Sequence, residues 1–149
     1  MVLKGTYCLI INLEDDNLIK VGSLGEILFK KGYYVYVGSA MNSLIARLRR
    51  HLSDDKKIHW HVDYLLLNKS SHISDIIYTT SEKKVECLLS TKIKESTDFI
   101  PQFGCSDCDC KSHLFYFNNQ ESSQNIIKNA YDSLDLEYFN LDDLKKLLI

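Results

Sequence analysis

The sequence predicts a single α/β domain (α+β) in which helices flank a small, mainly antiparallel central sheet. Short apolar runs rich in β-branched and aromatic residues, separated by polar turns, indicate strands. Several segments instead repeat apolar residues at helical spacing. With 149 residues, 45% of them hydrophobic, the chain is long enough to bury one good core.

The first third of the chain predicts strands joined by tight turns. Residues 5–13 form an apolar run that ends at a polar turn, which indicates a buried strand. Residues 18–21 and 26–29 flank a glycine-containing turn and predict a hairpin. The segment 33–37 carries the strongest strand pattern in the chain, because it consists of Tyr and Val alone.

A change to helical spacing follows this strand. Asn42 or Ser43 can cap a helix whose apolar residues recur through Leu52. The segment 58–67 can be a short helix or a strand, and the spacing of its apolar and acidic residues favours a helix.

The rest of the chain alternates strands and helices. Residues 79–82 have the form of a capping box, so we expect them to begin a helix that continues through Ile93. We further expect strands at 73–78 and 114–117, and helices around 126–131 and 141–148. Residues 1–117 then form the main domain, and 118–149 form a helical extension packed on the same domain.

Charge is segregated along the chain. The formal net charge of −2 excludes a uniformly basic surface, yet all three arginines lie at Arg47, Arg49 and Arg50, directly before His51. A guanidinium suits phosphate oxygens, so this cluster indicates a phosphate-facing surface, although a solvated helix face is the alternative. No apolar run is long enough for a membrane span and no signal peptide is evident. We expect a soluble, cytoplasmic protein without a membrane partner.

Two helices carry candidate catalytic residues. Arg47 and His51 are four residues apart, so they share one helix face and can point into one cleft. Glu86 lies at the edge of the apolar stripe of a later helix, where a carboxylate suits Mg²⁺. The alternative for both His51 and Glu86 is an ordinary surface residue.

These residues together resemble a known family. Gly5-Thr6-Tyr7, then Tyr36-Val37-Gly38-Ser39-Ala40, then Arg47 with His51, and then Glu86 are similar to the ordered signature of the GIY-YIG nuclease superfamily. The chain resembles in particular its Uri-like branch, which comprises uncharacterised archaeal and bacterial domains. The resemblance covers residues 5–117. The marks of this branch include Val21-Gly22-Ser23-Leu24-Gly25, His59-Trp60-His61-Val62-Asp63-Tyr64-Leu65 and Glu86-Cys87.

The resemblance implies a Mg²⁺- or Mn²⁺-dependent endonuclease that hydrolyses phosphodiester bonds in DNA, favoured over RNA, during repair or DNA processing. Tyr7 and Tyr36 would line the site, with Tyr7 helping to activate water. Arg47 would hold the scissile phosphate, Glu86 would bind the metal, and His51 would be a second proton carrier. We expect the substrate to contact Gly38, Ser39, Arg49, Arg50, Lys57, His59 and His61.

One departure concerns the space between the two tyrosine motifs. Simple members of the superfamily place these motifs close together, whereas here the predicted hairpin at 18–29 separates them. The hairpin can cover or extend the cleft, which affects substrate access.

The cysteines carry a competing signal. Three of the five lie at Cys105, Cys108 and Cys110, close to His113, and this odd, crowded set does not suit a disulfide framework. These four residues can form a zinc site, or the cysteines can pack against the core as small apolar residues. His59 and His61 can also ligate a metal, although rimming the cleft is the favoured role.

Three rival functions remain open on the sequence alone. A catalytically inactive module would bind nucleic acid through the arginines without cleaving it. A zinc-stabilised interaction domain would depend on the cysteine motif for its fold. A thiol redox protein would depend on Cys108 and not on Arg47. Neither the zinc domain nor the redox protein accounts for Tyr7 and Tyr36.

Overall fold

A four-stranded antiparallel sheet forms the centre of the computed structural model, which describes residues 2–105 and 110–148. The strand order is β5-β1-β4-β6. The central strand β1 is buried along nearly its whole length, which explains its continuous apolar run. The predicted strand at 114–117 is confirmed at the same bounds. The strands are β1 (Gly5–Leu13), β4 (Gly32–Ala40), β5 (Ser71–Tyr78) and β6 (Leu114–Phe117).

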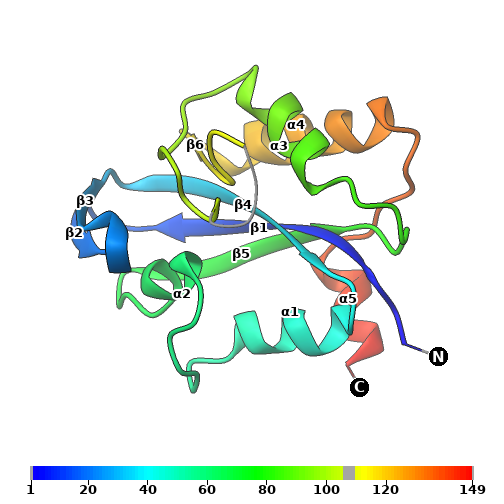
Figure 1. Cartoon of the computed structure of the whole chain (residues 1–149), viewed down its shortest axis with the longest axis horizontal. Coiled ribbons are helices and arrows are strands. Elements are labelled where there is room, and N and C mark those ends of the chain that lie inside the picture. The colour runs from blue at the N-terminus through cyan, green and yellow to red at the C-terminus, as the bar shows by residue number, and fades with distance from the viewer. Residues whose placement is uncertain (1, 106–109, 149) are drawn as a thin grey trace.

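The predicted hairpin is also confirmed and lies at one end of the sheet (Figure 1). Its strands are β2 (Asn17–Lys20) and β3 (Glu26–Phe29), joined by a 3-10 turn, η1 (Gly22–Leu24). Gly22 and Gly25 have φ angles of 47° and 76°, a region that favours glycine. Phe29 is fully buried and holds the hairpin against the core.

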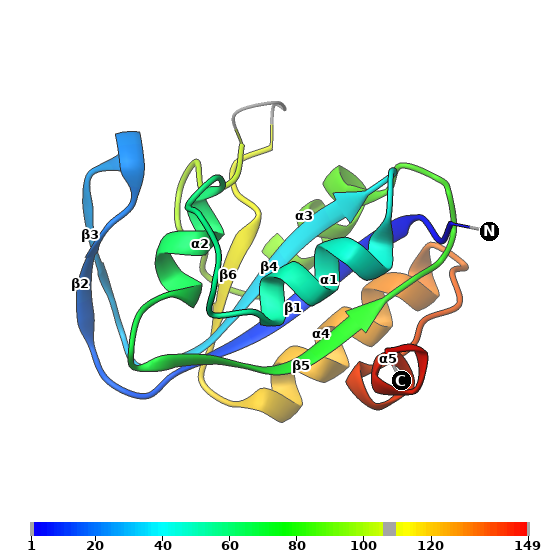
Figure 2. The same ribbon diagram turned by 90° about the horizontal axis from the view of Figure 1, so that it is seen from below.

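Helices cover both faces of the sheet (Figures 1 and 2). One face carries α3 (Glu86–Lys94) and α4 (Gln120–Ser133), and the other carries α1 (Leu44–Leu52), α2 (His61–Leu66) and α5 (Leu141–Leu147). Alternate residues of β1 supply the two cores, as the period of a strand requires. Tyr7 and Leu9 join the core under α1, whereas Cys8 and Ile10 join the core under α3 and α4.

Both helices that were predicted next to the arginine cluster are present. Ser43 caps α1, since its hydroxyl accepts a hydrogen bond from the backbone N–H of Ala46 at 3.2 Å. The segment 58–67 contains the short helix α2, which begins only at His61.

The predicted capping box at 79–82 is wrong. Thr79 continues the pairing of β5 with β1, because its backbone N–H donates to the carbonyl of Thr6 at 3.0 Å. Helix α3 begins later, at Glu86, and Val85 is its N-cap without a side-chain hydrogen bond. Strand pairing therefore overrides a local helix-start signal at this position.

The C-terminal helices belong to the same core. The hydroxyl of Tyr131 in α4 is buried and lies 3.1 Å from the carbonyl of Thr6 and 3.2 Å from that of Ile77. Phe139 forms an isolated bridge with Tyr78 that leads the chain into α5. Across the described residues, none of the helices combines the length and apolar character that crossing a membrane requires.

Candidate active site

A cavity of about 340 Å³ opens beside the ends of β1 and β4 that lie next to α1 and α3. Residues from these four elements line it, together with the start of α2, the two residues that precede α2, and one loop glycine. Eight of its lining residues were predicted from the sequence: Tyr7, Tyr36, Gly38, Ser39, Arg47, His59, His61 and Glu86. Trp60 and Gly104 complete the described lining.

Strand register brings the two tyrosine motifs together. Tyr7 on β1 pairs with Gly38 on β4, and Tyr36 pairs with Leu9, so both rings lie on the sheet face that α1 covers. A Cβ atom at position 38 would lie 2.6 Å from the Cζ and hydroxyl oxygen of Tyr7. Gly38 is thus required by the packing of Tyr7, a reason that the sequence did not reveal.

Tyr7 and His51 form a buried pair. The Tyr7 hydroxyl and the Nε2 atom of His51 are 2.7 Å apart. Burial raises the pKa of Tyr7 well above its usual value, and the charge of Arg47 only partly offsets this. Burial, followed by the charge of Lys56, lowers the pKa of His51 to about 3. At neutral pH the phenol is therefore protonated and the imidazole is neutral.

His51 lies behind the cavity and not at its surface. Only 2% of the side chain is exposed, and it reaches the cavity through Tyr7. Its Nδ1 atom is buried and has no hydrogen-bond partner among the described residues. Burial also raises the pKa of Tyr36 well above its usual value, helped by the neighbouring Tyr7 and Glu86.

Arg47 faces the cavity and is held at two points. Its Nη1 atom donates to the carbonyl of Ser39 at 3.0 Å, and its guanidinium lies 4.4 Å from the centre of the Trp60 ring. This stacking fixes the plane of the guanidinium. The guanidinium also interacts with the Tyr7 hydroxyl. Because it carries five N–H groups, others remain to receive an anion.

Arg50, which we expected to contact the substrate, is held by a partner within the protein. Its guanidinium forms a two-point ion pair with the buried carboxylate of Asp63, at 3.0 and 2.9 Å, and also donates to the carbonyl of Lys57 at 2.7 Å. It stacks on the Trp60 ring from a distance of 4.4 Å. The charge of Arg50 is therefore paired within the protein, and Arg50 is not among the described residues that line the cavity.

Asp63 organises the segment that precedes α2. Its carboxylate also accepts hydrogen bonds from the backbone N–H groups of His59 and Trp60, both at 2.9 Å. Burial by itself raises the pKa of Asp63. The hydrogen bonds from Arg50 and from these two N–H groups lower it by more than burial raises it, so the net shift is downward. The buried carboxylate is thus ionised, and both of its oxygen atoms accept hydrogen bonds.

Glu86 enters the cavity from the first turn of α3. Its Oε2 atom accepts a hydrogen bond from the Ser39 hydroxyl at 3.1 Å, and its Oε1 atom lies 3.6 Å from Nε2 of His113. The side chain is 29% exposed, so solvent reaches the carboxylate. Glu86 is the one carboxylate among the described residues that line the cavity, which suits an ion that takes few protein ligands.

The remaining predicted contact residues occupy the rim or the outer surface. His59 and His61 line the cavity, and Nδ1 of His61 accepts a hydrogen bond from the N–H of Gly104 at 2.9 Å. Burial lowers the pKa of His61. Arg49 and Lys57 are exposed and are not part of the described lining.

The hairpin leaves this cavity open. None of the described lining residues comes from β2, η1 or β3. The sequence left open whether the hairpin covers or extends the cleft, and within the described chain it does not cover the cavity.

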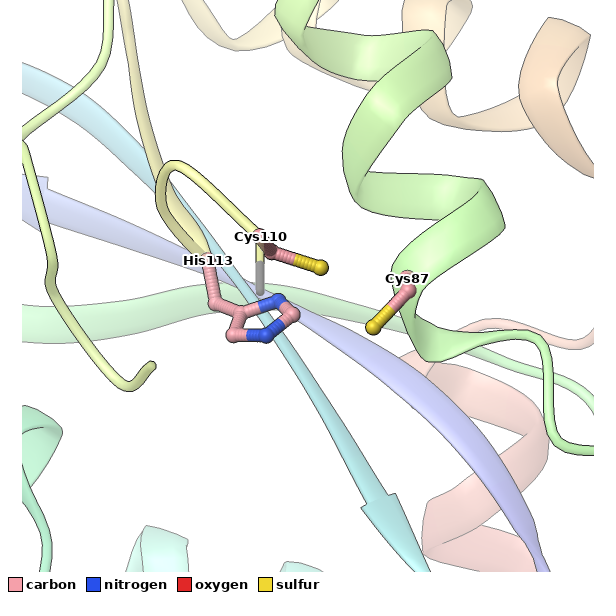
Figure 3. Close-up of side chains that lie close together, drawn as sticks. All are labelled: Cys87, Cys110 and His113. Carbon is pink, nitrogen blue, oxygen red and sulfur yellow. The ribbon is translucent and has the colours of Figure 1, made fainter. Parts of the chain in front are cut away.

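The residues that come together near His113 differ from the predicted cysteine motif. The side chains of Cys87, Cys110 and His113 gather at one place, with their ligand atoms all within 4.8 Å of one another (Figure 3). Cys105 is outside this group, and its Sγ donates to the carbonyl of Phe103 at 3.4 Å. Cys108 lies outside the described residues. Cys87 was missed because it is far from the motif in sequence, although it directly follows Glu86.

Trp60 is the second residue whose role sequence reasoning missed. Its ring lies against both Arg47 and Arg50, and it also lies beside the ring of His51. The sequence offered only the nearness of an aromatic residue to the arginine cluster, which does not show that the two meet in space.

The fold and the cavity define an α/β domain with a tyrosine, arginine and carboxylate site. The chain belongs to the family described as "Domain of unknown function DUF123", whose model matches residues 6–136. The match extends past residue 117 and through α4, in keeping with the packing of that helix on the sheet. No curated protein and no solved structure matches the chain.

Proposed function

We propose that this protein is a metal-dependent endonuclease of the GIY-YIG type that hydrolyses phosphodiester bonds in DNA, in repair or DNA processing. One observation carries the proposal. Tyr7, Tyr36, Arg47 and Glu86 come from four different elements and line a single cavity. The resemblance to the ordered motifs of the nuclease superfamily predicts that these four residues share one site.

Arg47 is the proposed phosphate ligand. Its backbone contact and its stacking on Trp60 hold it in place before substrate arrives. A preorganised guanidinium stabilises the charge that builds on the phosphate in the transition state without having to reorganise. The contacts of Arg47 with Ser39 and Trp60 that this role requires are present in the free protein.

Tyr7 and His51 supply a route for the proton of the attacking water. A protonated phenol is a poor base, but it can accept a proton from water while its own proton passes to Nε2 of His51, 2.7 Å away. The phenol is then neutral again and the imidazole is charged. The negative charge of a bound phosphate favours this imidazolium and so raises the pKa of His51.

The donor set around Glu86 fits a hard divalent cation. The carboxylate is partly exposed, is oriented by Ser39 and borders a cavity with space for water and a phosphate. When bound there, Mg²⁺ or Mn²⁺ supplies electrostatic stabilisation of the phosphate and the leaving oxygen. Ser39 would orient Glu86 in this role.

Cleavage of labelled single- and double-stranded DNA and RNA, with and without Mg²⁺ or Mn²⁺, tests the proposal. We expect DNA cleavage that requires the metal and that falls by about 100- to 1,000-fold in Arg47→Ala. Glu86→Gln keeps the shape of the side chain and should abolish the metal-dependent cleavage. Lys145→Ala is the control, because Lys145 is an exposed cation on α5 that does not line the cavity.

Two outcomes count against this function. Salt-dependent binding of DNA without cleavage under any metal condition would support the inactive binding module instead. Cleavage that survives Glu86→Gln would show a contaminating nuclease or a different site.

A further inference from the structure

We propose that Cys87, Cys110 and His113 form a zinc site that is separate from the cation position at Glu86. The three side chains come from two segments of the chain, α3 and the loop before β6, and meet only in the folded protein. Figure 3 shows the three side chains close together, with the sulfur atoms of Cys87 and Cys110 beside the imidazole ring of His113. The proposal does not depend on nuclease activity.

The distances suit zinc after a small contraction. The three ligand atoms lie within 4.8 Å of one another. Tetrahedral zinc has bonds of about 2.3 Å to sulfur and about 2.0 Å to nitrogen, which places its ligand atoms roughly 3.5–3.8 Å apart. A rotamer adjustment of the exposed Cys87 supplies a movement of this size.

The chemistry of the donors selects the metal. Two thiolates and an imidazole are ligands that zinc prefers, whereas Mg²⁺ prefers oxygen. The three ligands found among the described residues leave a fourth position, which water can fill. The Glu86 carboxylate, which carries the proposed Mg²⁺ or Mn²⁺ role, is thus not required as a ligand.

The surroundings of His113 match those of a metal-binding histidine. Such a histidine normally gives its second ring nitrogen to a hydroxyl, carbonyl or carboxylate, which fixes the ring. Nδ1 of His113 lies 2.6 Å from the Ser90 hydroxyl, and Nε2 lies 3.6 Å from Glu86. If Nε2 binds zinc, the Ser90 hydroxyl remains as the partner of Nδ1 and fixes the ring.

The site would connect two parts of the molecule. Zinc would tie the loop that ends at His113 to the first turn of α3, next to Glu86. The residue set also differs from the sequence motif, because Cys87 is included and Cys105 is not. This difference provides a direct test.

Zinc titration of the reduced, metal-free full-length protein, with competition by a chromophoric chelator, measures the site. We expect one equivalent of Zn²⁺ to bind, and Co²⁺ in its place to give the visible absorption of a tetrahedral thiolate complex. Cys87→Ser should weaken zinc binding by more than about 100-fold, since loss of a ligand exceeds the effect of losing an outer partner. Cys105→Ser is the matched control and should bind zinc as the wild type does.

Cys87→Ser is the decisive variant because Cys87 is exposed and its replacement does not disturb the core. Circular dichroism should show the same fold for both serine variants. Failure of the wild type to bind zinc, or equal binding by Cys87→Ser, would overturn the proposal. Loss of binding in Cys105→Ser with retention in Cys87→Ser would assign the metal to the sequence motif instead.

Discussion

The two walls of the cavity are built in different ways. The α1 wall comprises Arg47 and Trp60, which line the cavity, and Arg50 and Asp63 behind them. It combines an ion pair on a buried carboxylate with two guanidinium groups stacked on one ring.

The α3 wall comprises Ser39 and Glu86, which line the cavity, and His113 beside them. It contains one hydrogen bond at 3.1 Å and an approach of 3.6 Å between Oε1 of Glu86 and Nε2 of His113, whose pKa is lowered by burial. Its carboxylate is partly exposed, and α3 begins without a side-chain cap.

The difference between the two walls matches the different tasks proposed for Arg47 and Glu86. A phosphate-binding arginine gains from being held rigid, because reorganisation during the reaction is then small. A carboxylate that receives a hydrated cation must adapt to the ligand geometry that the ion demands. We therefore expect substitutions in the α1 wall to affect stability much more than substitutions in the α3 wall.

The largest effect should follow from breaking the α1 wall at Asp63. Asp63→Asn leaves the partly buried Arg50 without a counter-charge, and breaking such a pair costs about 3–5 kcal/mol. Urea denaturation measures the free energy of unfolding. Asp54→Asn, at an exposed position, is the control and should change it little. A loss below about 1 kcal/mol for Asp63→Asn would show that the α1 wall is not rigid.

The next effect concerns His51, which lies behind the α1 wall. Its pKa is about 3 in the folded protein and about 6.5 when unfolded, so the unfolded state binds the proton first as the pH falls. The free energy of unfolding should therefore decrease by about 1.4 kcal/mol per pH unit between pH 6.5 and 3 from this group.

His51→Gln should flatten this part of the pH profile of stability. The exposed His72 provides the control variant, His72→Gln, which should keep the wild-type slope. Parallel profiles for the wild type and His51→Gln would mean that His51 has the same pKa in the folded and unfolded states.

A smaller effect is expected at the strand pair that carries Tyr7. Gly38→Ala introduces a Cβ atom 2.6 Å from the Tyr7 ring and should cost about 1–3 kcal/mol in stability, with displacement of the phenol from His51. A double-mutant cycle measures the coupling. In the Tyr7→Ala background the cost of Gly38→Ala should disappear, and a cost that persists there would place the strain elsewhere.

The smallest effect should come from the α3 wall. Ser39→Ala removes the hydroxyl that donates to Glu86, but water can replace it because the carboxylate is 29% exposed. The free energy of unfolding should fall by less than about 1 kcal/mol in urea denaturation. A loss equal to that of Asp63→Asn would remove the contrast between the two walls.

Local sequence patterns were sufficient to predict most of the strands and helices. The strand at 114–117, the hairpin and the Ser43 cap follow from residue types and spacing within a few positions. The capping box at 79–82 failed because Thr79 pairs with Thr6, a residue far away in sequence. A local signal of about 1 kcal/mol does not outweigh the extension of a strand pair.

The site was predictable in part. The order of motifs led to the expectation that Tyr7, Tyr36, Arg47 and Glu86 share one place, and all four line the cavity. The sequence could not show that Arg50 pairs with Asp63 or that Cys87 takes a place beside Cys110. These are contacts between segments whose relative position depends on packing.

The sequence by itself determined where strands and helices form and which chemical groups the chain carries, because spacing and turn residues act locally. Only the tertiary structure decided which of those groups remain available for a ligand. Arg47 and Arg50 are the same residue type on one helix, yet a buried carboxylate satisfies the second and not the first. Desolvation and pairing depend on neighbours that are distant along the chain, and folding alone brings them together.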